Sequence, residues 1–381
     1  MTNDTGRKHA QEISTDVAIV GAGPIGIELA AALKQHSVPH EVFEAGQIGA
    51  TMQWWAPDTR FFSGPERIAV AGVPLVTPDQ SKATREQYLS YLRSVVSQHD
   101  LHIRTYERVV AIERHDTTHT HRFTLRTIHS SHGVGGPAEL LHDEDAVHLP
   151  PKTTCHANHI VLAIGDMHLP HMCNIPGEDL PHVSHFLDDP HVYFGKRVLI
   201  VGGKNSAVEA AIRLWRCGAK VTMSYRGAAL DEKRIKYWLY PEIQWLFDKQ
   251  QIAWHPSTVP VRIDERIVTL AGAQTHSTEI SVDADFVLLL TGYRQNPHLF
   301  EIAGVALEGE GRAPSHDHTT MQTNVPGIYV AGTASAGTQL RGVTSFIETS
   351  HVHVDRIVEH ITGAHDHHAP DAHHFDALPE S

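Results

Sequence analysis

Cysteine is scarce in this sequence, and its spacing excludes several kinds of protein. There are three cysteines, and no two of them form a Cys-x-x-Cys pair. Such an odd and sparse set excludes a disulfide framework and is typical of a reducing compartment. It also excludes a dithiol redox site of the Cys-x-x-Cys kind. The three are Cys155, Cys173 and Cys217.

Long hydrophobic runs and a surplus of positive charge are missing too. No apolar run reaches the roughly 18 residues that a membrane-spanning helix needs. Residues 1–15 are polar and lack the apolar core of a signal peptide. The formal net charge of −13 argues against nucleic-acid and anionic-membrane partners. We therefore expect a cytoplasmic protein with no nucleic-acid or membrane partner.

Histidine is abundant, with 32 copies, many of them in expected loops and five in the C-terminal stretch 365–374. Their spacing there fits no closed metal site. We therefore expect no metal site, and we expect residues 364–381 to form a disordered, His-rich tail.

One stretch, residues 17–33, has the pattern of a strand, a tight turn and a helix. In its turn, Gly21 allows the chain to reverse, Gly23 leaves room for a pyrophosphate, and Gly26 lets helix and strand pack closely. The helix N-terminus would offer N–H groups and a partial positive charge to phosphates. A second apolar strand ends at Glu44, 23 residues after Gly21, where an acid can bond a ribose 2′-hydroxyl. The stretch therefore predicts dinucleotide binding.

A second unit of the same kind spans residues 198–217, about 180 residues after the first. Gly202 and Gly203 begin its turn, and Lys204 stands where the second glycine of the motif is usual. Ala207 replaces the last glycine, which close helix–strand packing still permits.

The strand that follows this second unit ends differently from its counterpart. Lys220–Tyr225 is followed by Arg226 in place of an acid. An arginine at this position can bind a 2′-phosphate. We therefore predict NADP in preference to NAD.

The remaining pattern predicts further helices and strands. Residues 81–100 are expected to be a helix with Thr84 as its N-cap and Gln87 three residues on. Residues 130–152 are polar and rich in glycine and proline, as in a surface insertion. Strands are expected within 101–113, 122–128, 160–165, 253–280, 285–293 and 327–333, and helices at 240–250 and 344–363.

Two nucleotide units, each followed by an apolar strand ending in glycine, resemble the flavoproteins with two dinucleotide-binding domains. The resemblance implies an α/β fold with two Rossmann-like domains of the three-layer ββα type. The FAD domain would be discontinuous, with the NADPH domain inserted into it. The expected boundaries are 1–180 and 285–363 for the FAD domain and 190–284 for the NAD(P)H domain.

Several short stretches resemble the YpdA-type bacillithiol disulfide reductases, and together they cover most of residues 16–360. Gly-Gly-Lys-Asn-Ser-Ala at 202–207 is the most specific; the others lie at 61–63, 175–181, 183–185, 225–227, 289–293 and 323–324. The resemblance implies that FAD and NADPH serve to reduce a small-molecule disulfide, and that the chain forms a homo-oligomer.

The motifs and the resemblance together predict the cofactor-binding residues, whereas no catalytic residue is assigned. For FAD they are Gly21, Gly23, Pro24, Gly26, Glu44, Ala45, Gly46, Val110, Ala163, Gly165, Gly332 and Thr333. For NADP they are Gly202, Gly203, Lys204, Asn205, Ser206, Ala207, Arg226, Thr291, Gly292 and Tyr293.

The chain departs from this family at two positions. Family members carry a cysteine inside the first glycine turn, where this chain has Ile25, which can form no mixed disulfide. The superfamily usually has an acid that bonds FAD at the position of Thr333. Three alternatives therefore stay open: a flavin monooxygenase, for which 175–181 is an imperfect motif match, a nucleotide-binding sensor, and a reductase of a small redox protein.

Overall fold

The computed structural model describes residues 10–115, 119–130, 146, 148–274, 279–340 and 342–364. The chain forms two compact units, which are described separately. The first comprises residues 1–53, 60–169 and 294–381, and the second comprises 54–59 and 170–293. The expected tail from residue 365 and most of the expected insertion at 130–152 lie outside the described residues. The assignment of each unit to one nucleotide stays a prediction.

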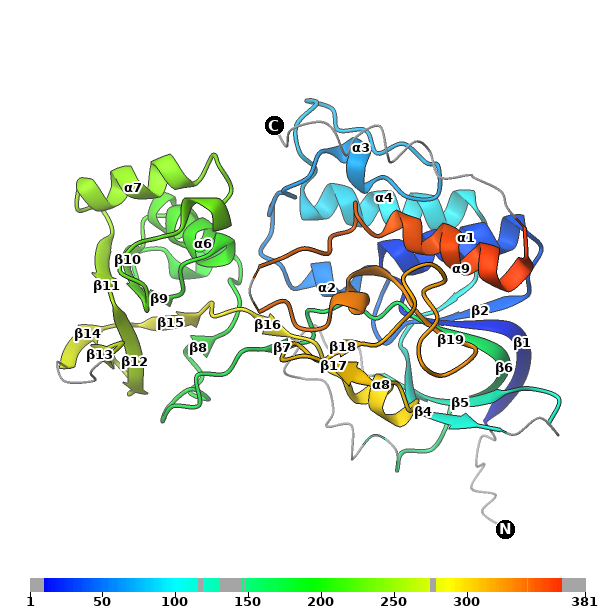
Figure 1. Cartoon of the computed structure of the whole chain (residues 1–381). Helices are drawn as coiled ribbons and strands as arrows, with labels where there is room; N and C mark the ends of the chain where they lie inside the picture. The colour runs from blue at the N-terminus through cyan, green and yellow to red at the C-terminus, as the bar shows by residue number, and fades with distance from the viewer. Residues whose placement is uncertain are drawn as a thin grey trace, which may run out of the picture. The chain divides into compact units, whose positions relative to one another are not determined.

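The first unit is built on a parallel sheet with the strand order β3-β2-β1-β6-β19 (Figure 1). β5 and β4 continue from β6 as antiparallel strands. The strands are β1 (Gln11–Val20), β2 (His40–Phe43), β3 (Ile103–Arg104), β4 (Glu107–Arg114), β5 (Phe123–His129), β6 (Thr153–Leu162) and β19 (Ile328–Val330).

Three helices cover one face of this sheet, and α1 packs against both of the others (Figure 1). They are α1 (Pro24–Gln35), α4 (Arg85–Gln98) and α9 (His351–Thr362). Residues 17–19 of β1 are fully buried, as expected for a central parallel strand covered on both faces. Short elements complete the unit: α2 (Ala50–Gln53), α3 (Pro65–Ile68), α8 (His298–Ile302), β17 (Leu307–Glu308), β18 (Ala313–Pro314) and the 3-10 helix η4 (Gly332–Ala336).

The start of α4 confirms the predicted N-cap. The Thr84 hydroxyl accepts a hydrogen bond from Gln87 N at 3.3 Å, and the Gln87 side-chain oxygen accepts one from Thr84 N at 2.8 Å. This reciprocal pair satisfies backbone N–H groups that a helix start leaves open.

Three predicted boundaries were wrong for a reason that lies in the tertiary structure. β1 begins at Gln11 rather than at residue 17, and β6 begins at Thr153 rather than at residue 160. The extra residues of the two strands pair with each other in parallel, and those of β6 also pair with β5. α9 begins at His351 rather than at 344. The Gln339 side-chain oxygen accepts hydrogen bonds from Thr344 N and Ser345 N, which keeps that segment in a loop.

The second unit contains a parallel sheet of order β11-β10-β9-β15-β8 and an antiparallel sheet β12-β13-β14 (Figure 1). The strands are β8 (Val183–Ser184), β9 (Arg197–Val201), β10 (Lys220–Tyr225), β11 (Ala253–Pro256), β12 (Thr258–Ile263), β13 (Ile267–Gly272), β14 (Glu279–Asp283) and β15 (Phe286–Leu289). The helices are α6 (Asn205–Arg216), α7 (Tyr240–Asp248) and the 3-10 helices η2 (Pro190–Tyr193) and η3 (Glu232–Arg234).

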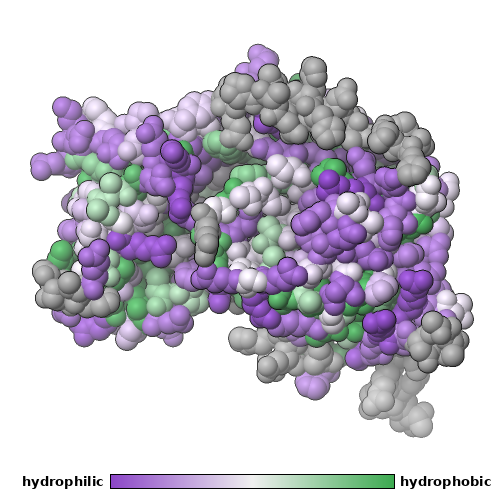
Figure 2. Space-filling model, viewed as in Figure 1, coloured by the Kyte–Doolittle hydropathy of each residue, from purple (hydrophilic) through white to green (hydrophobic). Residues whose placement is uncertain are grey.

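Where the chain passes between the units, β7 (Leu169–Pro170) pairs with β16 (Tyr293–Arg294). On the face drawn in Figure 2, hydrophilic side chains predominate and hydrophobic ones form smaller patches between them. Within the part of the chain that the structure describes, no helix combines the length and the apolar character needed to cross a membrane.

Candidate cofactor sites

The first glycine turn joins β1 to α1, with Pro24 in the first turn of the helix. Gly21 has a φ of +110°, and a Cβ there would lie 2.4 Å from the carbonyl oxygen of Ala163. A Cβ on Gly26 would lie 2.0 Å from the Gly21 carbonyl oxygen. A Cβ on Gly23, by contrast, would meet no atom within 4 Å. Two glycines are therefore required by the protein's own packing, while the space at Gly23 fits a bound pyrophosphate.

Glu44 follows β2 and is buried beside this turn. One carboxylate oxygen accepts a hydrogen bond from Ala22 N at 2.7 Å, and the other accepts one from Gly46 N at 2.8 Å. Burial raises the pKa of Glu44, and these two backbone hydrogen bonds lower it in part. Because each carboxylate oxygen has two lone pairs, Glu44 can fix the turn and still accept a ribose hydroxyl.

The other residues predicted for FAD lie mostly after the ends of adjacent parallel strands. Ala163 and Gly165 follow β6, and Gly332 and Thr333 follow β19. Parallel strands place their carboxyl ends at one edge, where nucleotides bind in open α/β sheets. A Cβ added to Gly332 would lie 3.4 Å from the Cβ of Ile25, so the turn after β19 packs against the turn after β1.

Ala45 and Gly46 follow β2 directly, and Gly46 shares the Glu44 carboxylate. Val110 lies inside β4 and is buried beside Ile128. The first residue of β4, Glu107, donates its N–H to the Glu44 carbonyl at 2.8 Å, which joins β4 to the end of β2.

Two polar side chains at this edge, those of Asp166 and Gln339, were not among the predicted residues. Asp166 comes directly after the glycine that follows β6, and its carboxylate accepts a hydrogen bond from Gln339 Nε2 at 2.9 Å. It also accepts one from the hydroxyl of Thr333. The signal available in the sequence was the position of Asp166, one residue after Gly165.

The second turn joins β9 to α6 and differs from the first in what surrounds it. Gly202 has a φ of +148°, and a Cβ there would lie 2.4 Å from the Leu290 carbonyl oxygen. A Cβ on Gly203 would lie 2.5 Å from the ring of Tyr225. Gly203 is therefore required by the packing of Tyr225, which the sequence motif did not indicate.

Positive charge gathers at this second turn. Burial lowers the pKa of Lys204, and the charges of Arg234 and Arg226 lower it further. Lys204 is the N-cap of α6, and Arg226 follows β10. Three cations near one helix N-terminus form an environment suited to a phosphate group. Arg234 was not among the predicted residues.

The remaining residues predicted for NADP have contacts within their own unit. The Asn205 side-chain oxygen accepts a hydrogen bond from Lys236 N at 2.6 Å. The Thr291 hydroxyl donates to the His171 carbonyl at 2.6 Å, and the Tyr293 hydroxyl donates to a backbone carbonyl, that of His185, at 3.3 Å. Gly292 has a φ of +107°. Ser206 and Ala207 lie in the first turn of α6. Their binding of NADP stays a prediction.

The thiols are poorly suited to nucleophilic chemistry. Burial raises the pKa of Cys155 to about 12 and that of Cys173 to about 11. The Cys217 thiol donates a hydrogen bond to the Pro190 carbonyl oxygen at 3.0 Å. Thiolates are the reactive form, so neither Cys155 nor Cys173 is activated near neutral pH. Over the described residues, no group of three or more His, Cys, Asp or Glu side chains is arranged to hold a metal ion.

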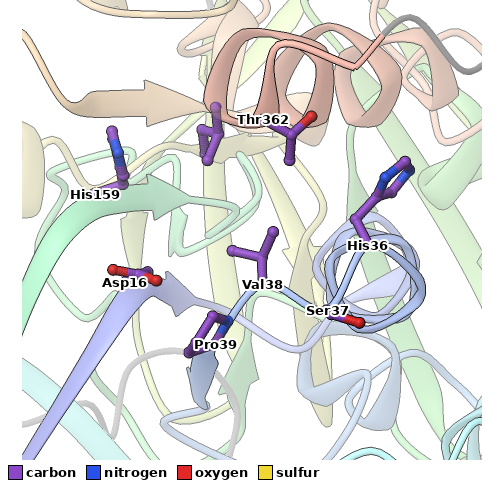
Figure 3. A pocket seen from close by; sticks show the side chains of 8 residues that line it. Asp16, His36, Ser37, Val38, Pro39, His159 and Thr362 are labelled. Atoms are coloured by element: carbon purple, nitrogen blue, oxygen red, sulfur yellow. The ribbon is translucent and has the colours of Figure 1, made fainter.

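An open hollow of about 430 Å³ lies near Asp16, His36 and His159 (Figure 3). It adjoins the C-terminal ends of α1 and α9, which carry partial negative charge. Phosphates bind at helix N-termini, so this hollow is distinct from the predicted nucleotide sites.

The comparisons with known proteins agree with this geometry. The model of the family "Pyridine nucleotide-disulphide oxidoreductase" matches residues 18–132 and 150–332. The curated protein Bacilliredoxin reductase Bdr from Bacillus subtilis (strain 168) is 30% identical over 355 residues, which cover 93% of this chain and 100% of that protein.

Two further proteins are similar over most of this chain. The solved structure of Bacillithiol Disulfide Reductase Bdr (YpdA) from Bacillus cereus has a TM-score of 0.80 and 29% identity, covering 92% of this chain and 99% of that one. A ferredoxin–NADP reductase from Ignicoccus hospitalis is 25% identical, covering 83% of this chain and 89% of that protein. The predicted α/β fold class with two Rossmann-like domains is thereby confirmed.

Proposed function

The chain belongs to the pyridine nucleotide-disulphide oxidoreductase family and is a flavin-dependent oxidoreductase; we propose that it uses FAD and NADPH to reduce a low-molecular-weight thiol disulfide of the bacillithiol disulfide class. The observation that carries this proposal is the similarity to bacilliredoxin and bacillithiol disulfide reductases over more than nine-tenths of the chain.

The first unit supplies the residues that would hold FAD. Gly23 leaves open space for the pyrophosphate at the N-terminus of α1, and Glu44 lies beside that turn with lone pairs available for the adenosine ribose. When bound, FAD supplies the two-electron chemistry by which electrons pass from a pyridine nucleotide to a disulfide. The protein's part in this transfer is alignment, which needs no acid or base from the chain.

The second unit supplies the residues that would hold NADPH. The cations Lys204, Arg226 and Arg234 together favour a nucleotide with an additional 2′-phosphate, which supports the preference for NADPH. The overall reaction would convert NADPH, a proton and one disulfide into NADP⁺ and two thiols.

A second candidate function rests on Ile25. Its side chain packs against Gly332 at the position where the family carries a cysteine, so this turn holds no thiol that could open a disulfide. The similarity to a ferredoxin–NADP reductase supports electron transfer to a small redox protein as the alternative.

The test is anaerobic reduction of the FAD-loaded protein by NADPH, followed by addition of one oxidant at a time. Reoxidation by bacillithiol disulfide, and slower reoxidation by glutathione disulfide or cystine, is the expected result. Reoxidation only by a ferredoxin would favour electron transfer. Rapid oxygen-dependent turnover with a soft nucleophile such as an organic sulfide would favour a monooxygenase.

A further inference from the structure

Asp166 is an acidic side chain at the carboxyl edge of the first unit's sheet, and no predicted role accounts for it. Asp166 is partly buried, and burial raises its pKa, while hydrogen bonds from Gln339 and Thr333 and the charge of His168 lower it. Over the described residues, no Lys or Arg lies within ion-pair distance of this carboxylate. A partly buried carboxylate of this kind is stabilised when its remaining lone pairs also accept hydrogen bonds.

The side chains around Asp166 fix its position. Gln339 uses its oxygen to accept Thr344 N and Ser345 N, at 2.7 and 3.0 Å. Its amide nitrogen is thereby directed to Asp166 Oδ2 at 2.9 Å. Gln295, which is 5% exposed, donates to both the Gly165 carbonyl at 3.0 Å and the Ala334 carbonyl at 2.9 Å.

Gln295 therefore ties the turn after β6 to the turn after β19. Asp166 and Thr333 lie one residue beyond the two glycines of these turns, Gly165 and Gly332. The turn after β1 adjoins both, because Gly21 packs on Ala163 and Ile25 packs on Gly332. Asp166 thus stands among three turns at the edge where a dinucleotide is expected.

The neighbouring imidazole of His168 is oriented by backbone groups. His168 Nδ1 accepts a hydrogen bond from Asn296 N at 2.9 Å, and its Nε2 donates to the Ile164 carbonyl at 2.8 Å. Both ring nitrogens thus contact backbone groups, and the charge of His168 lowers the pKa of Asp166. Asp166 therefore brings negative charge to this edge and would repel a phosphate.

A ligand suited to Asp166 must offer hydroxyl groups instead. A carboxylate has about four lone-pair positions, and Gln339, Thr333 and the backbone N–H of Asp166 occupy three of them. The position that remains can accept a hydrogen bond from a hydroxyl, such as one on a polyhydric chain. Within FAD, only the ribityl chain and the adenosine ribose carry hydroxyls, and Glu44 already lies where the ribose is expected.

We propose that Asp166, positioned by Gln339 and Thr333, binds a ribityl hydroxyl of FAD. This inference rests on the proposed function, because it requires FAD on the first turn. The acidic ligand for the ribityl chain would then lie after β6, at Asp166. The segment after β19 would contribute only the Thr333 hydroxyl.

The test measures binding rather than activity, using the full-length apoprotein and calorimetric titration with FAD and with ADP. ADP shares the adenosine and pyrophosphate groups of FAD but lacks the ribityl chain. Asp166→Asn is expected to weaken FAD binding about tenfold, as for a lost hydrogen bond to a charged group, and to change ADP binding less than twofold. Thr333→Val is expected to weaken FAD binding a few-fold, again without an effect on ADP.

Asp79→Asn is the matched control, because Asp79 also accepts a hydroxyl, that of Ser81, but lies exposed on a loop. It should change neither titration. Unchanged FAD binding in both Asp166→Asn and Thr333→Val, or equal weakening of FAD and ADP, would overturn the assignment of Asp166 to the ribityl chain. Failure of the wild-type protein to bind FAD would instead overturn the proposed function itself.

Discussion

The two glycine turns of this chain share one motif, yet their neighbours differ in a way that sets what each can bind. At the first turn, the Glu44 carboxylate holds two backbone N–H groups, and the space at Gly23 is open. At the second, the ring of Tyr225 fills the space at Gly203, and Lys204 brings positive charge. The first turn suits the hydroxyls of a ribose, and the second suits an additional phosphate.

The same comparison extends into the helices. Glu28 in α1 and Glu209 in α6 lie seven residues after the first glycine of their turns. Glu28 bonds His351 Nδ1 at 2.7 Å, whereas Glu209 bonds Lys236 Nζ at 2.7 Å. Equivalent acids thus tie α1 to a histidine and α6 to a lysine. Because only histidine titrates near neutral pH, the stability of the two units should depend differently on pH.

The largest effect is expected where the two turns pack differently. Gly26→Ala should lower the stability of the first unit by about 3 kcal/mol, because the new Cβ would lie 2.0 Å from the Gly21 carbonyl oxygen. The equivalent position already carries Ala207, and Ala207→Gly should cost only about 1 kcal/mol. Urea unfolding followed by circular dichroism measures both, and equal losses in the two variants would contradict the comparison.

The next effect concerns the positive charge at the second turn. Arg226→Ala should raise the Michaelis constant for NADPH tenfold to a hundredfold, or about 1.5–3 kcal/mol, through loss of an arginine–phosphate pair. The constant for NADH should stay nearly unchanged. Steady-state kinetics with both nucleotides measures this. A wild-type enzyme that uses NADH and NADPH equally well would show that Arg226 does not discriminate between them.

At the first turn, Glu44→Ala should weaken FAD binding by about 1–3 kcal/mol, since it removes an acceptor for the ribose. It also frees the N–H groups of Ala22 and Gly46, so Glu44→Gln is the better-matched variant. Flavin fluorescence titration of the apoprotein measures the change. Unaltered affinity in both variants would mean that Glu44 serves only to fix the turn.

The two helix acids give a smaller, pH-dependent contrast. Burial lowers the pKa of His351, but its hydrogen bond to Glu28 and the charge of Glu28 raise it by more, so the net shift is upward. The stabilisation from this pair is therefore complete below pH about 6.5, the ordinary histidine pKa, and is lost as the pH rises through the raised value.

Glu28→Gln should accordingly cost about 1.5 kcal/mol of stability at pH 6 and less at pH 8. Glu209→Gln is its control, and its cost should not vary over this range, because lysine side chains titrate far above neutral pH. Urea unfolding at the two pH values measures both variants. A pH-independent loss in Glu28→Gln would show that His351 does not carry the charge.

The smallest effect is expected from the thiols, which neither turn contains. Replacing Cys155, Cys173 and Cys217 together by serine should leave disulfide-dependent NADPH oxidation unchanged under anaerobic conditions. Burial raises the pKa of Cys155 and Cys173 to about 12 and about 11, which keeps both as unreactive thiols. Loss of this activity in a folded, FAD-loaded triple variant would show that a protein thiol carries the electrons.

Local patterns in the sequence were sufficient for much of the framework. The β-branched run before Gly21, the Ala-rich helix after it and the capping residues Thr84 and Gln87 each specify a conformation over a few residues. They predicted both strand–turn–helix units and the boundaries of β10. The end of β6 that pairs with β5 escaped prediction, because pairing between distant strands leaves no local signal.

The sequence by itself therefore determined which segments turn, which are buried and which charged residue follows each second strand. Only the tertiary structure decided which side chains meet. It placed His351 on Glu28, 323 residues away, Gln339 on Asp166, 173 residues away, and the Tyr225 ring on Gly203. Strand order and helix packing bring such groups together, and hydrophobic periodicity reports only whether a residue is buried, not which residue it contacts.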